Sequence, residues 1–261
     1  IRWFDDDEVV QLAEHATVPV INGLTDLTHP CQVMSDILTV EEHLGTIEGK
    51  TVCMVGDGNN LANSWLNAAT RFPFDFVLAC PEGYLPDEGI VRKAEAAGAS
   101  FMITHDPKEA VEGAHVIYSD AFYSMGQEEE AIKRRKDFAP FQITTDLLAG
   151  ADKDHIVLHC LPAHRGEEIT DEVMDGPHSV VFDEAENRMH AQRAIMATLI
   201  NSHIDTRLAS PSAVGLTEHT AARVASQSDG FRIAGSASSD RPSISAQLAS
   251  ISTKKLTQAA S

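Results

Sequence analysis

The sequence predicts an α/β fold built on a doubly wound parallel sheet. Short apolar segments recur along the first 200 residues, most of them separated by helical stretches. These segments are almost continuously apolar, as expected of parallel strands that helices cover on both faces. The expected strands are residues 51–55, 76–79, 101–104, 115–118, 141–144, 156–159 and 179–182. No apolar run approaches the ~18 residues that a membrane span needs.

Helix signals complete the alternation. Residues 5–15 form a short acidic segment that predicts a helix, and residues 18–21 read as a further strand. Residues 30–44 carry an apolar stripe at the spacing of one helix face, and another helix is expected from about Leu61. Asp106 followed by Pro107 is typical of a helix start. A last helix is expected over residues 184–200.

Five sections follow from this pattern. Residues 1–28 read as the remnant of a preceding domain, residues 29–44 as a bridging helix, and residues 45–183 as the main domain. Residues 184–200 should return toward the remnant. Residues 201–261, with 13 Ser and 11 Ala, read as a disordered tail or as a frame-shifted end. Because the chain starts at Ile1 without Met, we expect that coding sequence precedes it.

Charge and cysteine content narrow the class of protein. The net charge is −19, from 39 acidic and 20 basic residues, which argues against nucleic acid or an anionic membrane as a partner. Either adaptation to high salt or plain solubility would explain such a surface. The four cysteines form no CxxC pair, so reduced thiols in a cytoplasmic protein are expected.

Polar loops follow four of the expected strands, at the edge where a doubly wound sheet binds its ligands. The loops are Gly56-Asp57-Gly58-Asn59-Asn60, residues 119–127, residues 160–166 and residues 183–188. The two glycines of the first loop are weak evidence for a nucleotide, because Leu61 replaces the third glycine of the dinucleotide fingerprint. Asn59 and Asn60 at a helix N-terminus suit a small carboxylate.

Other polar residues allow two interpretations. Cys160 is either a buried small residue or a functional thiol on this rim. His159, Cys160 and His164 lack a fourth ligand, which disfavours zinc. Residues 128–135, three glutamates followed by basic residues, read as a solvated helix face with i,i+4 pairing.

Together these motifs resemble the ornithine carbamoyltransferase family. They are His29-Pro30-Cys31-Gln32, the loop 56–60, Asp120 ahead of Ser124-Met125-Gly126, His159-Cys160-Leu161-Pro162 and Glu186-Asn187-Arg188. The resemblance runs from residue 1 to about 200, and it implies an ornithine-binding domain joined to the remnant of a carbamoyl-phosphate-binding domain. The family's Ser-Thr-Arg-Thr-Arg phosphate loop is absent from this sequence.

The resemblance also implies the site. The ornithine-binding residues would be Asn60, Asp120, Ser124 and Met125. The residues around carbamoyl phosphate would be Arg2, His29, Gln32, Cys160, Leu161 and Arg188. Among these, Cys160, Asp120, His29 and Arg2 would act in catalysis.

The implied reaction transfers the carbamoyl group of carbamoyl phosphate to the δ-amine of L-ornithine, giving L-citrulline and phosphate in arginine metabolism. Family members form trimers and need no metal or organic cofactor, so small-molecule substrates and a homo-oligomer are the implied partners. Two other readings stay open: a carbamoyltransferase for another amine, such as putrescine or an acylated ornithine, and a non-catalytic amino-acid-binding fragment. Without the phosphate loop, the chain itself is expected to be inactive.

Overall fold

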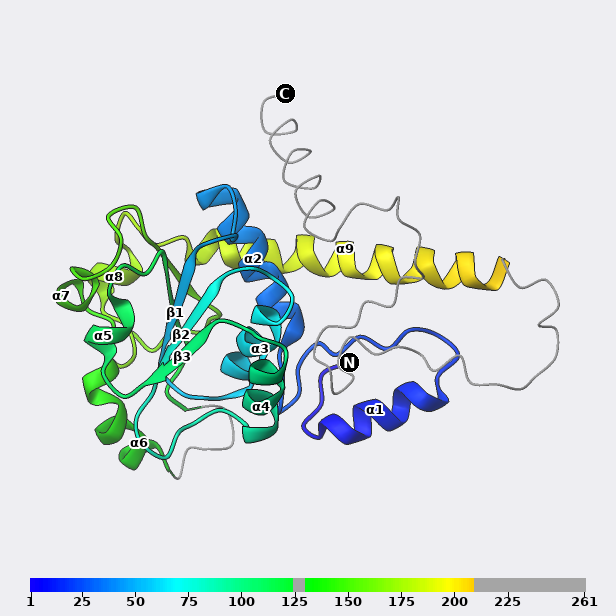
Figure 1. Cartoon of the computed structure of the whole chain (residues 1–261), viewed down its shortest axis with the longest axis horizontal. Helices are drawn as coiled ribbons and strands as arrows, with labels where there is room; N and C mark the ends of the chain where they lie inside the picture. The colour runs from blue at the N-terminus through cyan, green and yellow to red at the C-terminus, as the bar shows by residue number, and fades with distance from the viewer. Residues whose placement is uncertain (124–129, 209–261) are drawn as a thin grey trace.

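The computed structural model describes residues 1–123 and 130–208, and their centre is a five-stranded parallel sheet (Figure 1). The strand order is β3-β2-β1-β4-β5. The strands are β1 (Thr51–Val55), β2 (Asp75–Ala79), β3 (Phe101–Thr104), β4 (Val116–Ser119) and β5 (Ile156–His159). Because the chain moves outward from β1 in both directions, the sheet is doubly wound, as the sequence predicted.

Helices cover both faces of this sheet. The helices are α1 (Asp6–His15), α2 (Pro30–Leu44), α3 (Asn60–Ala69), α4 (Glu88–Ala96), α5 (Pro107–Val111), α6 (Ala131–Phe138), α7 (Thr145–Leu148), α8 (Asp171–Met174) and α9 (Val181–Leu208), with a 3-10 turn η2 (Ala139–Phe141) after α6. Alternate strand residues explain the layering. Val52 and Met54 pack in the core with α2, α3 and α4, whereas Cys53 and Val55 pack in the core with α5 to α8. Side chains that alternate across a buried strand fill both cores.

Capping residues mark the ends of helices at the positions that the sequence predicted. Asp106 Oδ1 accepts a hydrogen bond from the Lys108 amide at 2.9 Å, ahead of Pro107 in α5. Gly45 ends α2 with a φ of 80°, a conformation that glycine adopts without strain. The expected bounds of α2, residues 30–44, are confirmed.

Three expected strands are not formed. Residues 18–21 belong to no strand, and residues 141–144 contribute only the bridge between Ile143 and Ile169. In residues 179–182, Ser179 makes a single bridge to Val157, and Val181 already begins α9. A short apolar run has no period that distinguishes a strand from a buried helical turn. In residues 179–182, the last two residues belong to helix α9.

The last helix is longer than expected. It begins at Val181 rather than 184 and runs to Leu208, into the section expected to be a tail. Residues 209–261 lie outside the described residues. Along α9, Ala191 packs with Met34 and Leu38 of α2. The exposed large apolar residues of this helix, Phe182, Met189, Met196 and Ile200, recur at intervals of seven, seven and four residues and so share one face.

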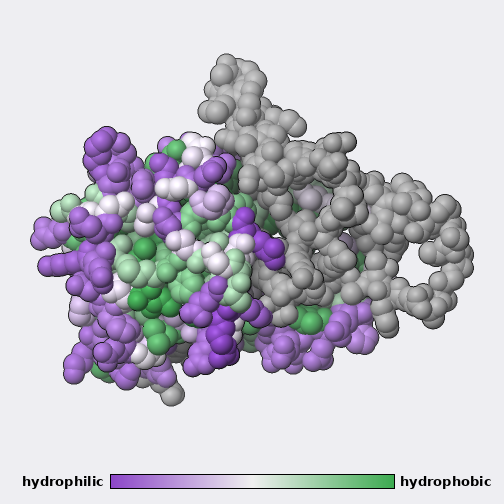
Figure 2. Space-filling view, viewed as in Figure 1, coloured by the Kyte–Doolittle hydropathy of each residue, from purple (hydrophilic) through white to green (hydrophobic). Residues whose placement is uncertain are grey.

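The surface in view is mainly hydrophilic, with hydrophobic residues gathered over the sheet near β3 (Figure 2). Strand β3 lies at one edge of the sheet, and its residue Met102 is 40% exposed. Within residues 1–123 and 130–208, no helix combines the length and the apolar character needed to cross a bilayer.

Candidate active site

The candidate site lies where β1, β4 and β5 end. Val55 pairs with Ser119, and Ser119 pairs with His159, so the residues that follow these three leave the sheet side by side. A Cβ on Gly56 would lie 4.0 Å from the carbonyl oxygen of Asp120. This edge is the point at which the strand order reverses, the usual ligand position in such sheets.

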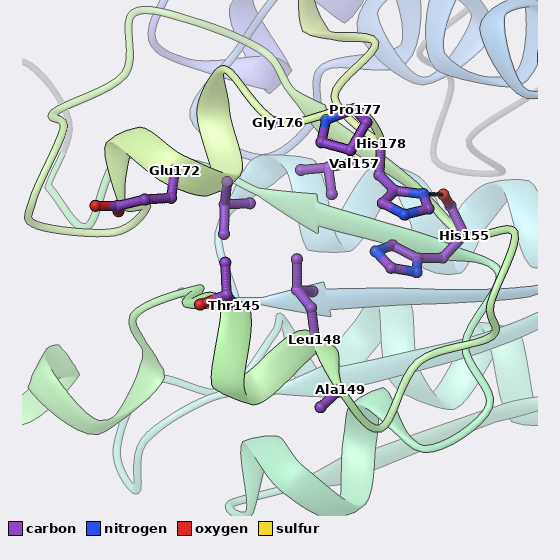
Figure 3. Close-up of a pocket in the computed structure, with 10 residues that line it drawn as sticks. Thr145, Leu148, Ala149, His155, Val157, Glu172, Gly176, Pro177 and His178 are labelled. Carbon is purple, nitrogen blue, oxygen red and sulfur yellow. Dashed lines mark hydrogen bonds between the residues drawn. The ribbon is translucent and has the colours of Figure 1, made fainter.

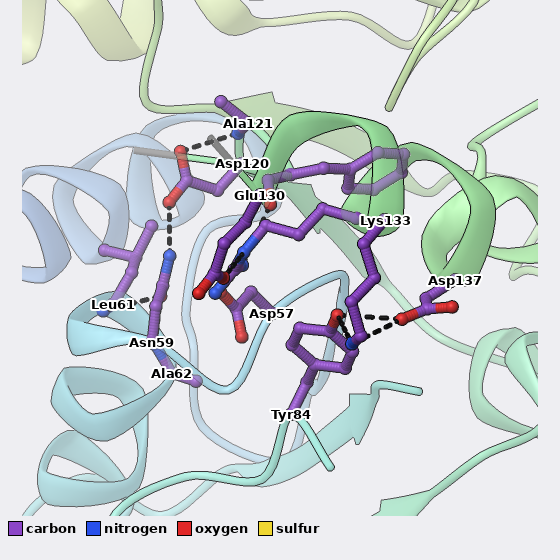
Figure 4. A network of polar contacts seen from close by, with 12 residues as sticks. Asp57, Asn59, Leu61, Ala62, Tyr84, Asp120, Ala121, Glu130, Lys133 and Asp137 are labelled. Atoms are coloured by element: carbon purple, nitrogen blue, oxygen red, sulfur yellow. Dashed lines mark hydrogen bonds and ion pairs between the residues drawn. The ribbon is translucent and has the colours of Figure 1, made fainter. Parts of the chain in front are cut away.

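Asp120 forms the centre of a three-residue cluster. The Cys160 thiol donates to Asp120 Oδ1 at 3.0 Å. Asn59 Nδ2 donates to Asp120 Oδ2 at 2.8 Å (Figure 4). Asn59 also caps α3, since its side-chain oxygen accepts from the amides of Leu61 at 2.9 Å and Ala62 at 3.4 Å. One asparagine therefore ties the start of α3 to the carboxylate of Asp120.

The environment keeps the Cys160 thiol protonated. Burial, and next the negative charge of Asp120, raise the pKa of Cys160 well above the usual thiol range. At neutral pH the sulfur is therefore a hydrogen-bond donor to Asp120. In this structure Cys160 is therefore a hydrogen-bond donor and not a thiolate.

Asn60, the asparagine predicted to bind ornithine, makes no hydrogen bond to this cluster within the described residues. Its Nδ2 donates to the carbonyl oxygen of Thr25 at 2.8 Å, which joins the start of α3 to the N-terminal segment. Thr25 in turn donates to Asp6 Oδ1 at 2.6 Å. Asn60 thus lies one residue from the cluster and connects it to residues 1–28. The predicted residues Ser124 and Met125 lie outside the described residues.

Three of the residues predicted around carbamoyl phosphate, His29, Gln32 and Arg188, come together at the start of α2. His29 precedes Pro30, the first residue of α2, and its amide donates to Ser64 Oγ of α3 at 2.7 Å. Arg188 Nη1 of α9 donates to Gln32 Oε1. Burial, followed by the charges of Arg188 and Arg2, lowers the pKa of His29 to about 3. His29 is therefore neutral at pH 7, and its buried Nδ1 has no hydrogen-bond partner among the described residues.

Leu161 is held in an unusual conformation beside Cys160. Its φ is 58°, the left-handed region that a leucine rarely occupies. The Leu161 amide donates to His159 Nδ1 at 2.9 Å, so the ring proton lies on Nε2, which donates to Glu168 Oε1 at 3.1 Å. Glu168 is fully buried, and sequence reasoning missed it because it sits in a Gly-Glu-Glu turn that looks exposed.

The basic run on α6 is only partly a solvated face, which corrects the sequence prediction. Arg134 is 7% exposed, and its Nη1 donates to Asp57 Oδ2 at 2.6 Å and to the carbonyl oxygen of Phe122 at 3.0 Å. Its neighbour Lys133 remains outside, where it contacts Tyr84 and Asp137 at 2.8 and 2.9 Å (Figure 4). Arg134 therefore fastens α6 to the loop after β1.

The glycines of that loop serve packing. A Cβ on Gly58 would lie 2.5 Å from the Tyr84 carbonyl oxygen and from backbone atoms of Leu85 and Pro86. The Gly58 amide donates to the Tyr84 carbonyl at 2.9 Å. Close approach of two backbone segments explains this glycine without a nucleotide.

A separate hollow of about 280 Å³ lies at the opposite end of β5 (Figure 3). The stacked rings of His155 and His178, with centroids 4.1 Å apart, form one wall, and Val157 and Leu148 line it as well. It includes no predicted site residue. Within residues 1–123 and 130–208, no group of three His, Cys, Asp or Glu side chains could hold a metal ion.

Comparison with known proteins agrees with this fold. The family model described as "Aspartate/ornithine carbamoyltransferase, Asp/Orn binding domain" matches residues 48–199, and the model for the family's carbamoyl-P binding domain matches residues 1–42. Ornithine carbamoyltransferase from Syntrophotalea carbinolica is 55% identical over 200 residues, which cover 77% of this chain and 66% of that protein.

Solved structures give the same result. Ornithine carbamoyltransferase from Pyrococcus furiosus is 54% identical with a TM-score of 0.71, over 75% of this chain and 64% of that one. An N-acetyl-L-ornithine transcarbamylase is 33% identical with a TM-score of 0.66, over 76% of this chain and 67% of that one. The chain thus spans about two thirds of the length of these relatives. Since both domain models match in sequence order and the relatives share this sheet, the chain belongs to the aspartate/ornithine carbamoyltransferase family.

Proposed function

We propose that this chain carries the ornithine-binding side of an ornithine carbamoyltransferase, which converts L-ornithine and carbamoyl phosphate to L-citrulline and phosphate. The observation that carries the proposal is the hydrogen bond between Cys160 and Asp120 at 3.0 Å, at the end of two neighbouring strands. It joins two motifs that resemble those of the family, 40 residues apart in the sequence. The names of the relatives at 54% and 55% identity support the same amine.

The amino-acid end of ornithine would lie at the start of α3. The exposed amides and positive dipole of a helix N-terminus favour a carboxylate there. The carboxylate of Asp120 would pair with the α-ammonium group of ornithine. Asn59 fixes the orientation of that carboxylate by donating to its Oδ2. Asn60, Ser124 and Met125 would complete the contacts, as the family resemblance implies.

The δ-amine must be neutral to attack the carbonyl carbon. Its nitrogen lone pair forms the new C–N bond, and the C–O bond to phosphate breaks with its electrons on the leaving phosphate. The proton that the nitrogen loses passes to that phosphate, the strongest base formed. Because Cys160 remains a thiol, its role is to orient Asp120 and the amine rather than to accept the proton at the outset.

The carbonyl oxygen gains charge during the attack and needs donors in place. A neutral His29 can donate one N–H without the cost of desolvating a cation, and Arg2 and Arg188 supply positive charge nearby. A preorganised donor of this kind is typically worth about 3 kcal/mol of barrier. Gln32 and the Leu161 backbone would bind the carbamoyl amide.

The test is a citrulline assay on the 261-residue chain and on a version extended upstream by a relative's segment with the Ser-Thr-Arg-Thr-Arg loop. We expect citrulline from the extended chain only. The loop supplies charge-assisted hydrogen bonds worth about 1.5–3 kcal/mol each, and ordered reactants gain up to about 7–11 kcal/mol. Robust citrulline production by the short chain would contradict this location of the phosphate site.

The choice of amine is tested with ornithine, N-acetylornithine and putrescine on the extended chain. Ornithine should be carbamoylated fastest, and preference for another amine would replace the proposal with the corresponding transferase.

Calorimetry on the 261-residue chain measures ornithine binding without requiring catalysis. Asp120→Asn should weaken ornithine binding about tenfold or more, whereas Asp146→Asn, at an exposed position of α7, should leave it unchanged. Binding without turnover in the extended chain would indicate a non-catalytic amino-acid-binding protein.

A further inference from the structure

Two carboxyl groups that the proposed reaction does not use lie buried between α2 and α9. Asp36 of α2 and Glu184 of α9 are both fully buried. Glu184 receives three donors: Gln32 Nε2 at 3.0 Å and the Tyr118 hydroxyl at 3.3 Å on Oε1, and the His159 amide at 2.7 Å on Oε2. Its position therefore joins α2, β4 and the start of the loop that carries Cys160.

The hydrogen bonds of Asp36 differ from those of Glu184. Asp36 Oδ1 accepts from Gln32 Nε2 at 2.8 Å. Asp36 Oδ2 is buried and receives no donor within the described part of the chain. The two carboxyl groups lie close together, because both accept from the same atom, Gln32 Nε2, at 2.8 and 3.0 Å. A proton on Asp36 Oδ2 would turn this unpaired acceptor into a donor to Glu184 and would leave the buried pair fully bonded.

The surrounding charges favour one proton shared by Asp36 and Glu184. Four charged or titratable groups face Asp36. Glu184 and Arg188 come from α9, Tyr118 comes from β4, and Cys160 follows β5. Burial raises the pKa of Asp36 to about 7, and burial together with the Asp36 charge raises the pKa of Glu184 well above its usual range, so both groups compete for a proton. The three donors on Glu184, against one on Asp36, favour the ionised form at Glu184. Two adjacent buried carboxylates repel each other strongly, so one remains protonated.

We propose that Asp36 and Glu184 share a single proton, held on Asp36 Oδ2, and that this pair is a positioning device for Gln32. Both carboxyl groups accept from Gln32 Nε2, so the amide oxygen of Gln32 must point the other way, toward Arg188. Glu184 alone of the pair accepts from the His159 amide, at the start of the Cys160 loop. The function of Gln32 toward carbamoyl phosphate rests on the proposed activity, but the shared proton does not.

Infrared spectroscopy of the 261-residue chain tests the proton directly. At pH 6, the wild-type spectrum minus that of Asp36→Asn should show the C=O stretch of one protonated carboxylic acid. Carboxyl-¹³C labelling of aspartate should shift this band, and the same labelling of glutamate should not. Absence of the band, or a shift with labelled glutamate, would overturn the assignment. Neither result depends on any substrate.

Two amide variants test which partner carries the proton. In Asp36→Asn the new amide can accept from Gln32 and donate to Glu184, as the protonated aspartate does. In Glu184→Gln an NH₂ group replaces one of the oxygens that receive donors. At pH 7.5 we expect Asp36→Asn to have a thermal midpoint at least equal to wild type and Glu184→Gln a midpoint several degrees lower. The reverse order would place the proton on Glu184 and contradict the proposal.

The orientation of Gln32 has its own readout. Its side-chain amide protons should exchange slowly with solvent in NMR spectra of the wild type and of Asp36→Asn. The exchange should become fast in Asp36→Ala, which removes one of the two acceptors. Gln32 protons that exchange equally fast in all three would refute positioning by the pair. Failure of the citrulline assay would leave these measurements unaffected, so the two proposals fail separately.

Discussion

The thiol of Cys160 donates to Oδ1 of Asp120 across 3.0 Å, and the sheet sets that distance. Ser119 and His159 are paired residues at the ends of β4 and β5, and Asp120 and Cys160 are the next residue of each strand. Neighbouring parallel strands lie about 4.8 Å apart. Two short side chains that start at that spacing can meet without help from flexible loops.

This contact predicts how the thiol reacts. Because Asp120 raises the pKa of Cys160, Asp120→Asn should lower that pKa and increase the thiolate fraction at pH 8. Alkylation of Cys160 by iodoacetamide should accelerate about tenfold for each unit by which the pKa falls. Peptide mass spectrometry distinguishes Cys160 from the buried Cys31, Cys53 and Cys80. Asp146→Asn serves as the matched control, and equal rates in the two variants would contradict the coupling.

The ion pair between Arg134 and Asp57 predicts a large loss of stability on truncation. The two side chains are 9% and 14% exposed, so Arg134→Met leaves a buried carboxylate without its cation. We expect the free energy of unfolding to fall by about 3–5 kcal/mol in urea titrations. Adding Asp57→Asn should recover part of that loss, because the stranded charge is then removed.

A neighbouring residue provides the control for this prediction. Lys133 also pairs with an aspartate, but its side chain is 70% exposed, so Lys133→Met should change stability little. If Arg134→Met were as mild as Lys133→Met, the buried pair would contribute nothing to the attachment of α6.

The neutral state of His29 predicts a dependence of stability on pH. Its folded pKa of about 3 lies below the ordinary value of 6.5, so protonation favours the unfolded chain. This contribution is complete above pH 6.5 and declines as the pH falls toward 3, by up to about 1.4 kcal/mol per pH unit. Urea titrations from pH 7 to 4 should therefore show a steeper decline for wild type than for His29→Asn. Parallel curves would mean that His29 protonates in the folded state.

The sequence predicted the sheet well because its five strands are apolar runs between helix starts with clear caps. It failed at residues 179–182, where the apolar run is the beginning of α9, and Val181 is buried as a helix residue instead of a strand residue. The three apolar residues 180–182 fit either structure, because so short a run has no period that distinguishes a strand from a helical turn.

The site was predictable to the level of motifs but not of individual contacts. Asn59 and Asn60 are adjacent and chemically identical, and consecutive residues at a helix start face different directions, so sequence alone could not tell which one meets Asp120. Arg134 lies between Lys133 and Arg135, which are both exposed, and burial of the middle charge depends on Asp57, 77 residues away. Such long-range pairs leave no local pattern.

The strand order bears on how members of this family can diverge. Asp120 and Cys160 inherit their positions from the register of β4 and β5, which cannot slip without moving both cores from one face to the other. Residues 121–123, by contrast, come after Ser119, the last paired residue of β4, so the ladder does not fix them. Substitutions there can change the edge of the proposed site without changing the register of the sheet. Under the proposed function, the accepted amine can therefore change during evolution while Asp120 and Cys160 keep their positions.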